Sequence, residues 1–212
     1  MRPIVSHVAD ASGRLDELQA RITEAFATAT DAARTLLAAQ GIDVVFVDAP
    51  DETIPEWGVG GTTLGPHAIV VALDPGFDVE ATTIEATLLH EFHHAMRWRG
   101  PGCAEDLARM LVSEGLAQLF EEDVQPFYSK CSITDEEIAL AHEHLFDAHC
   151  DRGTWFFGAN SVTRCFGYTY GYRLCRAFAE RTGQLASDLV DVSASEVLAS
   201  CGVLLDARDR LM

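Results

Sequence analysis

One short stretch constrains this chain of 212 residues more than any other. Residues 88–96 read Leu-Leu-His-Glu-Phe-His-His-Ala-Met, which places His90 and His94 four positions apart in an apolar run with helical spacing. On a helix, such side chains differ by about 40° around the axis, so both imidazoles can bind one zinc ion. Glu91 lies about 100° from His90 and nearer to His94, where it can flank an ion without ligating it. The pattern predicts a metal-binding helix with a general base for a bound water.

A second ligand pair is geometrically possible on the same helix. His90 and His93 are three positions apart and also share a face. That choice would leave Glu91 about 160° from His93, on the wrong side of the helix to serve the ion. We therefore take His90 and His94 as the ligands and His93 as a neighbour. The alternative is an ordinary helix with scattered histidines, because five-residue motifs also arise by chance.

The next apolar segment supplies a third candidate ligand. Glu114 lies twenty residues after His94, in a segment from Ala104 to Phe120 that is largely apolar on one side. An unpaired carboxylate in such a setting is costly, and a bound cation would remove that cost. Residues 97–102 form a breaker cluster that allows the second helix to run back along the first. We expect Glu114 to meet the two histidines; the alternative is a solvated residue at the edge of the apolar face.

The spacing of these motifs resembles that of a known group of proteins. His90-Glu91-x-x-His94, followed by Glu114 in a Ser-Glu-Gly-Leu-Ala context, resembles the gluzincin metallopeptidases. The closer resemblance is to the small proteins of the DUF2268 family, described as predicted Zn-dependent proteases, from about Gly58 to about Gly183. It implies a zincin-like fold, one Zn²⁺ per chain, and hydrolysis of a peptide or protein substrate. It also implies that an extended peptide pairs with an edge strand just before the motif helix.

In that reaction, zinc lowers the pKa of a bound water, and Glu91 takes its proton during attack on the scissile carbonyl. Tyr168, in a Tyr-x-x-Gly sequence expected to open a helix, resembles the downstream tyrosine of related zinc aminopeptidases. We choose it over Tyr170 and Tyr172 as the donor to the oxyanion.

Two departures from the gluzincin pattern stand out. Several gluzincins carry an aspartate four residues after the zinc glutamate, to orient a histidine ligand. Gln118 occupies that position here, so Glu121 or a backbone carbonyl would take the role. The chain also lacks the Gly-Ala-Met-Glu-Asn sequence of the large aminopeptidases, so amino-terminal trimming has no support.

Hydrophobic periodicity predicts an α+β fold, with a small N-terminal sheet followed by a mainly helical body that carries the motif. Residues 14–40 have helical period, and further strands and a helix are expected at 42–47, 59–63, 67–73 and 135–150. The glycines at 58, 60 and 61 either allow close backbone approach or are plain turn residues. His142, His144 and His149, in the last helix, read as surface or hydrogen-bonded histidines rather than a second metal site.

Length and charge limit the remaining possibilities. A chain of this size is most simply one domain, residues 1–212. A net charge of −18 argues against a nucleic-acid partner, since phosphate binding needs a basic surface. The first ten residues do not read as a signal peptide and no long apolar span occurs, so we expect a cytoplasmic protein with no membrane partner. The six cysteines then read as reduced thiols, with disulfides possible only after export.

Two rival functions remain open. The chain could be a zinc-stabilised binding or regulatory protein whose peptidase site is occluded, although such a protein has no use for Glu91. It could also be a helical interaction protein without metal, which requires both motifs to be accidents. The sequence does not indicate the substrate or the oligomeric state.

Overall fold

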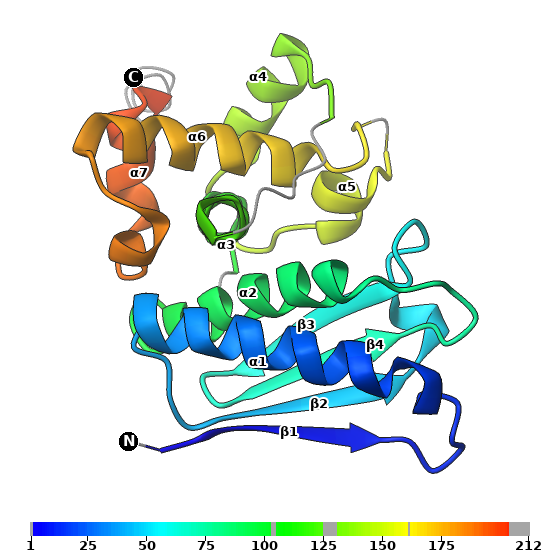
Figure 1. Ribbon diagram of the computed structural model, residues 1–212. Coiled ribbons are helices and arrows are strands. Elements are labelled where there is room, and N and C mark those ends of the chain that lie inside the picture. Colours follow the sequence, from blue (N-terminus) through cyan, green and yellow to red (C-terminus); the bar gives the residue numbers. More distant parts are fainter. Residues whose placement is uncertain (1, 103–104, 125–130, 161, 204–212) are drawn as a thin grey trace. The chain divides into compact units, whose positions relative to one another are not determined.

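The computed structural model describes residues 2–102, 105–124, 131–160 and 162–203. It divides into two compact units, Met1–Arg99 and Gly100–Met212. The first unit holds the sheet and two long helices, and the second is helical (Figure 1). The α+β fold class is therefore confirmed. That all 212 residues form a single domain stays a prediction.

A four-stranded mixed sheet forms the base of the first unit. Its strands are β1 (Ile4–Ala9), β2 (Ile42–Asp48), β3 (Val59–Gly65) and β4 (Ala68–Leu73). They lie in the order β1-β2-β4-β3, with β1, β2 and β4 parallel and β3 antiparallel to β4. β3 and β1 are thus the edge strands, whereas β4, the last strand before the motif helix, lies inside the sheet.

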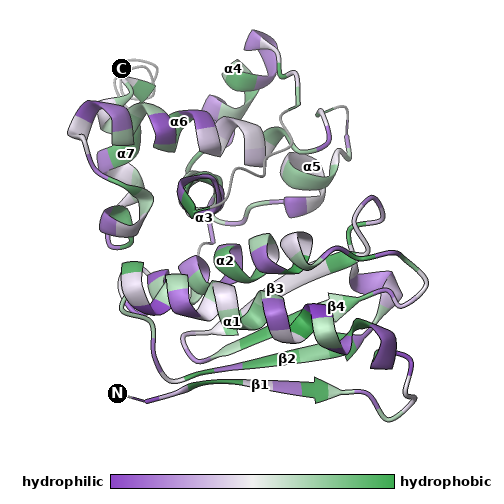
Figure 2. Cartoon of the chain, in the orientation of Figure 1, coloured by the Kyte–Doolittle hydropathy of each residue, from purple (hydrophilic) through white to green (hydrophobic). Residues whose placement is uncertain are grey.

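Two helices, α1 (Gln19–Leu36) and α2 (Ala81–Arg97), cover one face of this sheet (Figure 1). The central strands are largely apolar, as Figure 2 shows, because alternate residues of each point into the core under the helices. Val44 and Phe46 of β2 and Val71 of β4 are completely buried there. The predicted helix at 14–40 is confirmed in shortened form: a 3₁₀ turn, Asp16–Leu18, precedes it, and Ala38 beyond its end has a left-handed backbone.

The glycines of the predicted turn region serve close approach. Gly60 and Gly61 lie inside β3, not in a turn. A Cβ atom on Gly60 would strike the backbone oxygen of Glu52, and one on Gly58, whose φ is +66°, would meet the Phe77 ring at 2.6 Å. The chain therefore leaves no room for a side chain at Gly58, just before β3, or at Gly60 within it.

The second unit is built around a central pair of helices. Its helices are α3 (Leu107–Val124), α4 (Asp135–His144), α5 (Arg152–Phe157), α6 (Phe166–Thr182) and α7 (Ala194–Ser200), with a 3₁₀ turn at Ala186–Leu189 before α7. Gly115 of α3 and Gly171 of α6 face each other's helix backbones, so α3 and α6 pack at glycine contacts. The helix predicted at 135–150 ends at His144, and α5 follows as a separate helix.

The cysteines differ from the prediction. Cys131 and Cys165 form a disulfide that joins the segment before α4 to the start of α6, so the reading of all cysteines as reduced thiols is wrong for these two. Cys150, Cys175 and Cys201 take no part in a disulfide. Cys103 lies outside the described residues. Widely spaced cysteines could be paired only from the fold, because connectivity is not encoded locally.

Across the residues that the structure describes, no helix combines the length and apolarity needed to cross a membrane.

Candidate metal-binding and active-site residues

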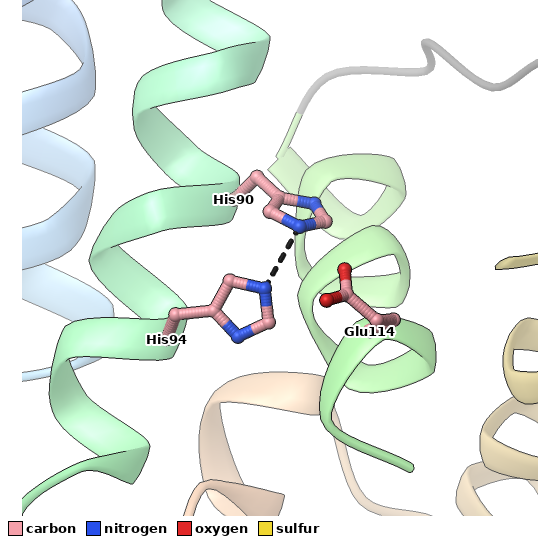
Figure 3. A group of neighbouring side chains, drawn as sticks. All are labelled: His90, His94 and Glu114. Carbon is pink, nitrogen blue, oxygen red and sulfur yellow. Dashed lines mark hydrogen bonds between the residues drawn. The ribbon is translucent and has the colours of Figure 1, made fainter. Parts of the chain in front are cut away.

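The histidine pair lies in the C-terminal half of the amphipathic helix α2. Ile84, Leu88 and Phe92 of this helix are completely buried in the first unit. His90 and His94 are half-buried, and their Nε2 atoms lie 2.9 Å apart (Figure 3). Their rings meet edge to face, at 76°. The two Nε2 atoms therefore face each other at hydrogen-bond distance.

This arrangement suits a zinc ion. Two nitrogen ligands at about 2.0–2.1 Å from a tetrahedral zinc are about 3.3 Å apart. The observed separation of 2.9 Å is within a few tenths of an ångström of that value, so a small rotation of either ring would fit the ion. His93, in contrast, is fully buried and is not part of this pair.

Glu91 is held next to the pair by the edge strand. The residue is only 6% exposed. The Thr63 hydroxyl, on β3, lies 2.7 Å from Glu91 Oε2 and 3.0 Å from the Glu91 backbone oxygen, and it donates to both acceptors. On the same face of β3, a Cβ atom at Gly61 would come within 2.7 Å of Glu91 Cγ and Oε1. Two residues on one face of β3 thus hold the carboxylate in place.

Thr63 is a site residue that the sequence reasoning missed. Gly61 and Thr63 are two apart on a strand, so they point to the same face. The alternation of residues in the strand before the motif helix was the one sequence feature from which Thr63 could have been predicted. The bond itself spans 28 residues, and it becomes visible only when β3 and α2 are packed together.

Glu114 lies in the second unit, on α3 (Figure 3), and is buried. The sequence argument assumed a carboxylate with no partner within the protein. The structure differs: Arg152 Nη2 donates to Glu114 Oε1 at 3.2 Å. Burial acts to lower the pKa of the Arg152 guanidinium, but the charges of Glu114 and Tyr168 outweigh it and raise that pKa above its ordinary value. Glu114 therefore forms an ion pair with Arg152, whose guanidinium stays positively charged.

Tyr168 lies in the first turn of α6, as predicted, and is half-buried. Its ring packs edge-on against Phe156, with centroids 5.0 Å apart, and its hydroxyl hydrogen-bonds Arg152. The two rival tyrosines have other partners: Tyr170 bonds His142 at 2.6 Å, and Tyr172 bonds Glu122. Burial raises the pKa of Tyr170 and of Tyr172 to about 12 in each case.

Several polar residues near the motifs have simpler roles. His144 Nδ1 bonds Asp147 at 2.7 Å, so His142 and His144 are hydrogen-bonded histidines, as expected. Gln118 Oε1 is buried, with no hydrogen-bond partner among the described residues. Glu121 is also buried on α3. That Glu121 orients a histidine ligand stays a prediction.

The chain is an α+β protein with histidine and carboxylate side chains of the kind that could hold a metal ion. The family model for DUF2268, described as "Predicted Zn-dependent protease", matches residues 19–199. The match covers well over half of the chain, so the chain belongs to this family. No curated protein and no solved structure matches it.

Proposed function

We propose that the chain is a zinc-dependent peptidase in which His90, His94 and Glu114 hold one zinc ion. Two imidazoles and a carboxylate are a ligand set of zinc hydrolases, which leave the fourth position for water. The observation that carries the proposal is the convergence of the His90 and His94 Nε2 atoms beside a buried, hydrogen-bonded Glu91. That Glu114, from the second unit, completes the ligand set is part of the proposal.

Each remaining residue has a defined task in this reaction. A bound zinc ion would supply Lewis acidity and lower the pKa of a water molecule. Glu91 accepts the proton of that water as it attacks the scissile carbonyl, and then gives it to the leaving amine. Tyr168 donates a hydrogen bond to the oxyanion that develops on the carbonyl oxygen. A purely structural metal site would need neither group.

The edge strand provides a way to bind a peptide. β3 pairs with β4 along one edge, its first residue Val59 is also bridged to Ile54, and it carries Thr63 and Gly61 beside Glu91. An extended substrate can add to such an edge through its main chain, which tolerates many sequences. We therefore propose a peptide or protein substrate in extended conformation, with no nucleic-acid partner.

Zinc content tests the ligand set. We expect about one zinc per chain in the purified wild type, and loss or strong weakening in Glu114→Ala, because removing one of three ligands leaves an incomplete site. Glu136→Ala, which removes an exposed glutamate of the same unit, is the matched control and should keep its zinc. A folded wild type that takes up no zinc would refute the proposal.

Glu91→Gln separates catalysis from metal binding. We expect this variant to keep its zinc but to lose turnover of a peptide library by about 10²–10⁴-fold, the usual contribution of a general base. Retained turnover would contradict the assigned role. A wild type that holds zinc and cleaves no peptide would instead favour the zinc-stabilised binding protein.

A further inference from the structure

Arg152 is held in place more firmly than an ordinary surface arginine. It is the first residue of α5, and the preceding Asp151 caps this helix by accepting hydrogen bonds from Thr154, at 3.3 Å from the amide nitrogen and 2.7 Å from the hydroxyl. Its guanidinium carbon lies 5.6 Å from the centre of the Phe156 ring, one turn along the helix. The cap fixes its backbone and the ring fixes its side chain.

From this position the guanidinium bonds two groups on two other helices. It donates to Glu114 of α3 and hydrogen-bonds Tyr168 of α6. Phe156 contributes again here, because Tyr168 packs edge-on against its ring. A Cβ atom on Gly167 would strike that ring, so a glycine at this position lets the first turn of α6 come close. Arg152 and Phe156 thus join α3, α5 and α6.

The two ends of the ion pair are unequally exposed. The Arg152 side chain is 48% exposed and that of Glu114 is 8% exposed. A carboxylate that is almost completely buried depends on its partner far more than an exposed one does. The bond to Arg152 is made through Oε1, which restrains the rotation of the carboxylate. A guanidinium suits this task because its donors form a planar fork that can bond two acceptors at once.

We propose that Arg152 is a positioning residue that orients both Glu114 as a metal ligand and Tyr168 as an oxyanion donor. This inference rests on the proposed function, because it takes the roles of Glu114 and Tyr168 from it. Ligand carboxylates of metal sites are commonly held by hydrogen bonds from a residue behind them, and losing that residue typically weakens metal affinity or activity 10–100-fold. None of the sequence motifs pointed to Arg152.

Zinc affinity and turnover, measured on the same variants, test both halves of the inference. Arg152→Met keeps much of the side-chain length but removes the donors. Competition with a chromogenic chelator should show zinc bound about 10–100-fold more weakly than in the wild type. In zinc-saturated protein, kcat should fall by a similar factor while KM changes little, since the extended substrate binds elsewhere. Arg173→Met removes an exposed arginine of α6 and is the matched control for charge.

Two further variants separate positioning from mere stability. Arg152→Lys keeps the charge, but its single ammonium group cannot reproduce the planar fork, so we expect an intermediate zinc affinity in a fully folded protein. Tyr168→Phe should lower kcat, and adding Arg152→Met to it should lower kcat no further if the arginine acts on catalysis through that hydroxyl.

The failures are distinguishable. A wild type without zinc refutes the proposed function itself, before any variant is made. If the wild type binds zinc and cleaves peptide, but Arg152→Met matches it in zinc affinity and kcat, the proposed function stands and the positioning role falls. If the losses of kcat in Arg152→Met and Tyr168→Phe multiply in the double variant, the part of the inference that concerns Tyr168 is overturned.

Discussion

At the scale of single residues, the contact between Thr63 and Glu91 makes a prediction that the motif alone could not. Thr63→Val preserves the shape of the side chain but removes the hydroxyl that donates to Glu91 Oε2 at 2.7 Å. A hydrogen bond to a charged group contributes about 1.5–3 kcal/mol, so we expect kcat to fall by roughly ten- to a hundredfold. Zinc content should not change, because Thr63 does not bond the histidines. Steady-state kinetics and metal analysis of the same preparation measure both quantities.

Thr63→Ser is the control for this prediction. It keeps the hydroxyl and removes only a methyl group, so its kcat should stay close to that of the wild type. Full activity in Thr63→Val would show that the edge strand does not hold the general base.

The candidate residues differ in how far the sequence could predict them. His90, Glu91 and His94 follow from helical spacing alone, because all three lie on one helix. Glu114 required an argument about burial, and the structure confirms the burial but adds Arg152 as its partner. Thr63 and Arg152 act across separations of 28 and 38 residues, so no local pattern could reveal them.

At the scale of elements, the approach of β3 to α2 is set by Gly61. A methyl group there would lie 2.7 Å from Glu91 Cγ and 2.8 Å from Thr87 Cγ2, closer than real Cβ contacts. Either the strand or the glutamate must move, and overpacking of this kind typically costs about 1–3 kcal/mol. We expect Gly61→Ala to lower the free energy of unfolding by that amount in urea titrations and to lose activity.

Gly65, at the end of the same strand, provides a matched control. A Cβ atom there meets nothing within 4 Å. Gly65→Ala should therefore change the free energy of unfolding by no more than about 0.5 kcal/mol. Equal losses in both variants would mean that Gly61 is needed for the conformation of the strand and not for its contact with α2.

The elements that the sequence predicted are those with one buried face. β2, β4, α1 and α2 each bury a regular set of apolar residues, so their period is visible in the sequence. β1 was not predicted, because only Ile4 of its six residues is buried and an edge strand of this kind has no alternation. The helix at 135–150 was predicted too long because apolar residues continue past its end, although Phe146 is 58% exposed.

At the scale of the whole molecule, the two units are stabilised by different means. The first unit depends on a sheet covered by α1 and α2. The second has no sheet among its described residues, but it contains the disulfide between Cys131 and Cys165, which closes a loop across a sequence separation of 34 residues. A cross-link stabilises a protein mainly by restricting the unfolded chain, and more so for longer loops. Its effect should therefore be confined to the unit that contains both cysteines.

Reduction of this disulfide makes the difference measurable. For a loop of this length, chain entropy predicts that dithiothreitol lowers the free energy of unfolding of the second unit by about 3–4 kcal/mol. Hydrogen exchange followed by mass spectrometry should then show faster exchange in peptides from α3 and α6, with α1 and α2 unchanged. Cys131→Ala/Cys165→Ala should reproduce this pattern without reductant, and Cys150→Ala, which removes a half-buried cysteine outside the disulfide, should not. Equal loss of protection in both units would show that the chain unfolds as one cooperative domain, as the sequence alone predicts. Selective loss would mean that the histidine pair and Glu114 belong to parts that unfold separately, so that the ion they are proposed to share would stabilise both.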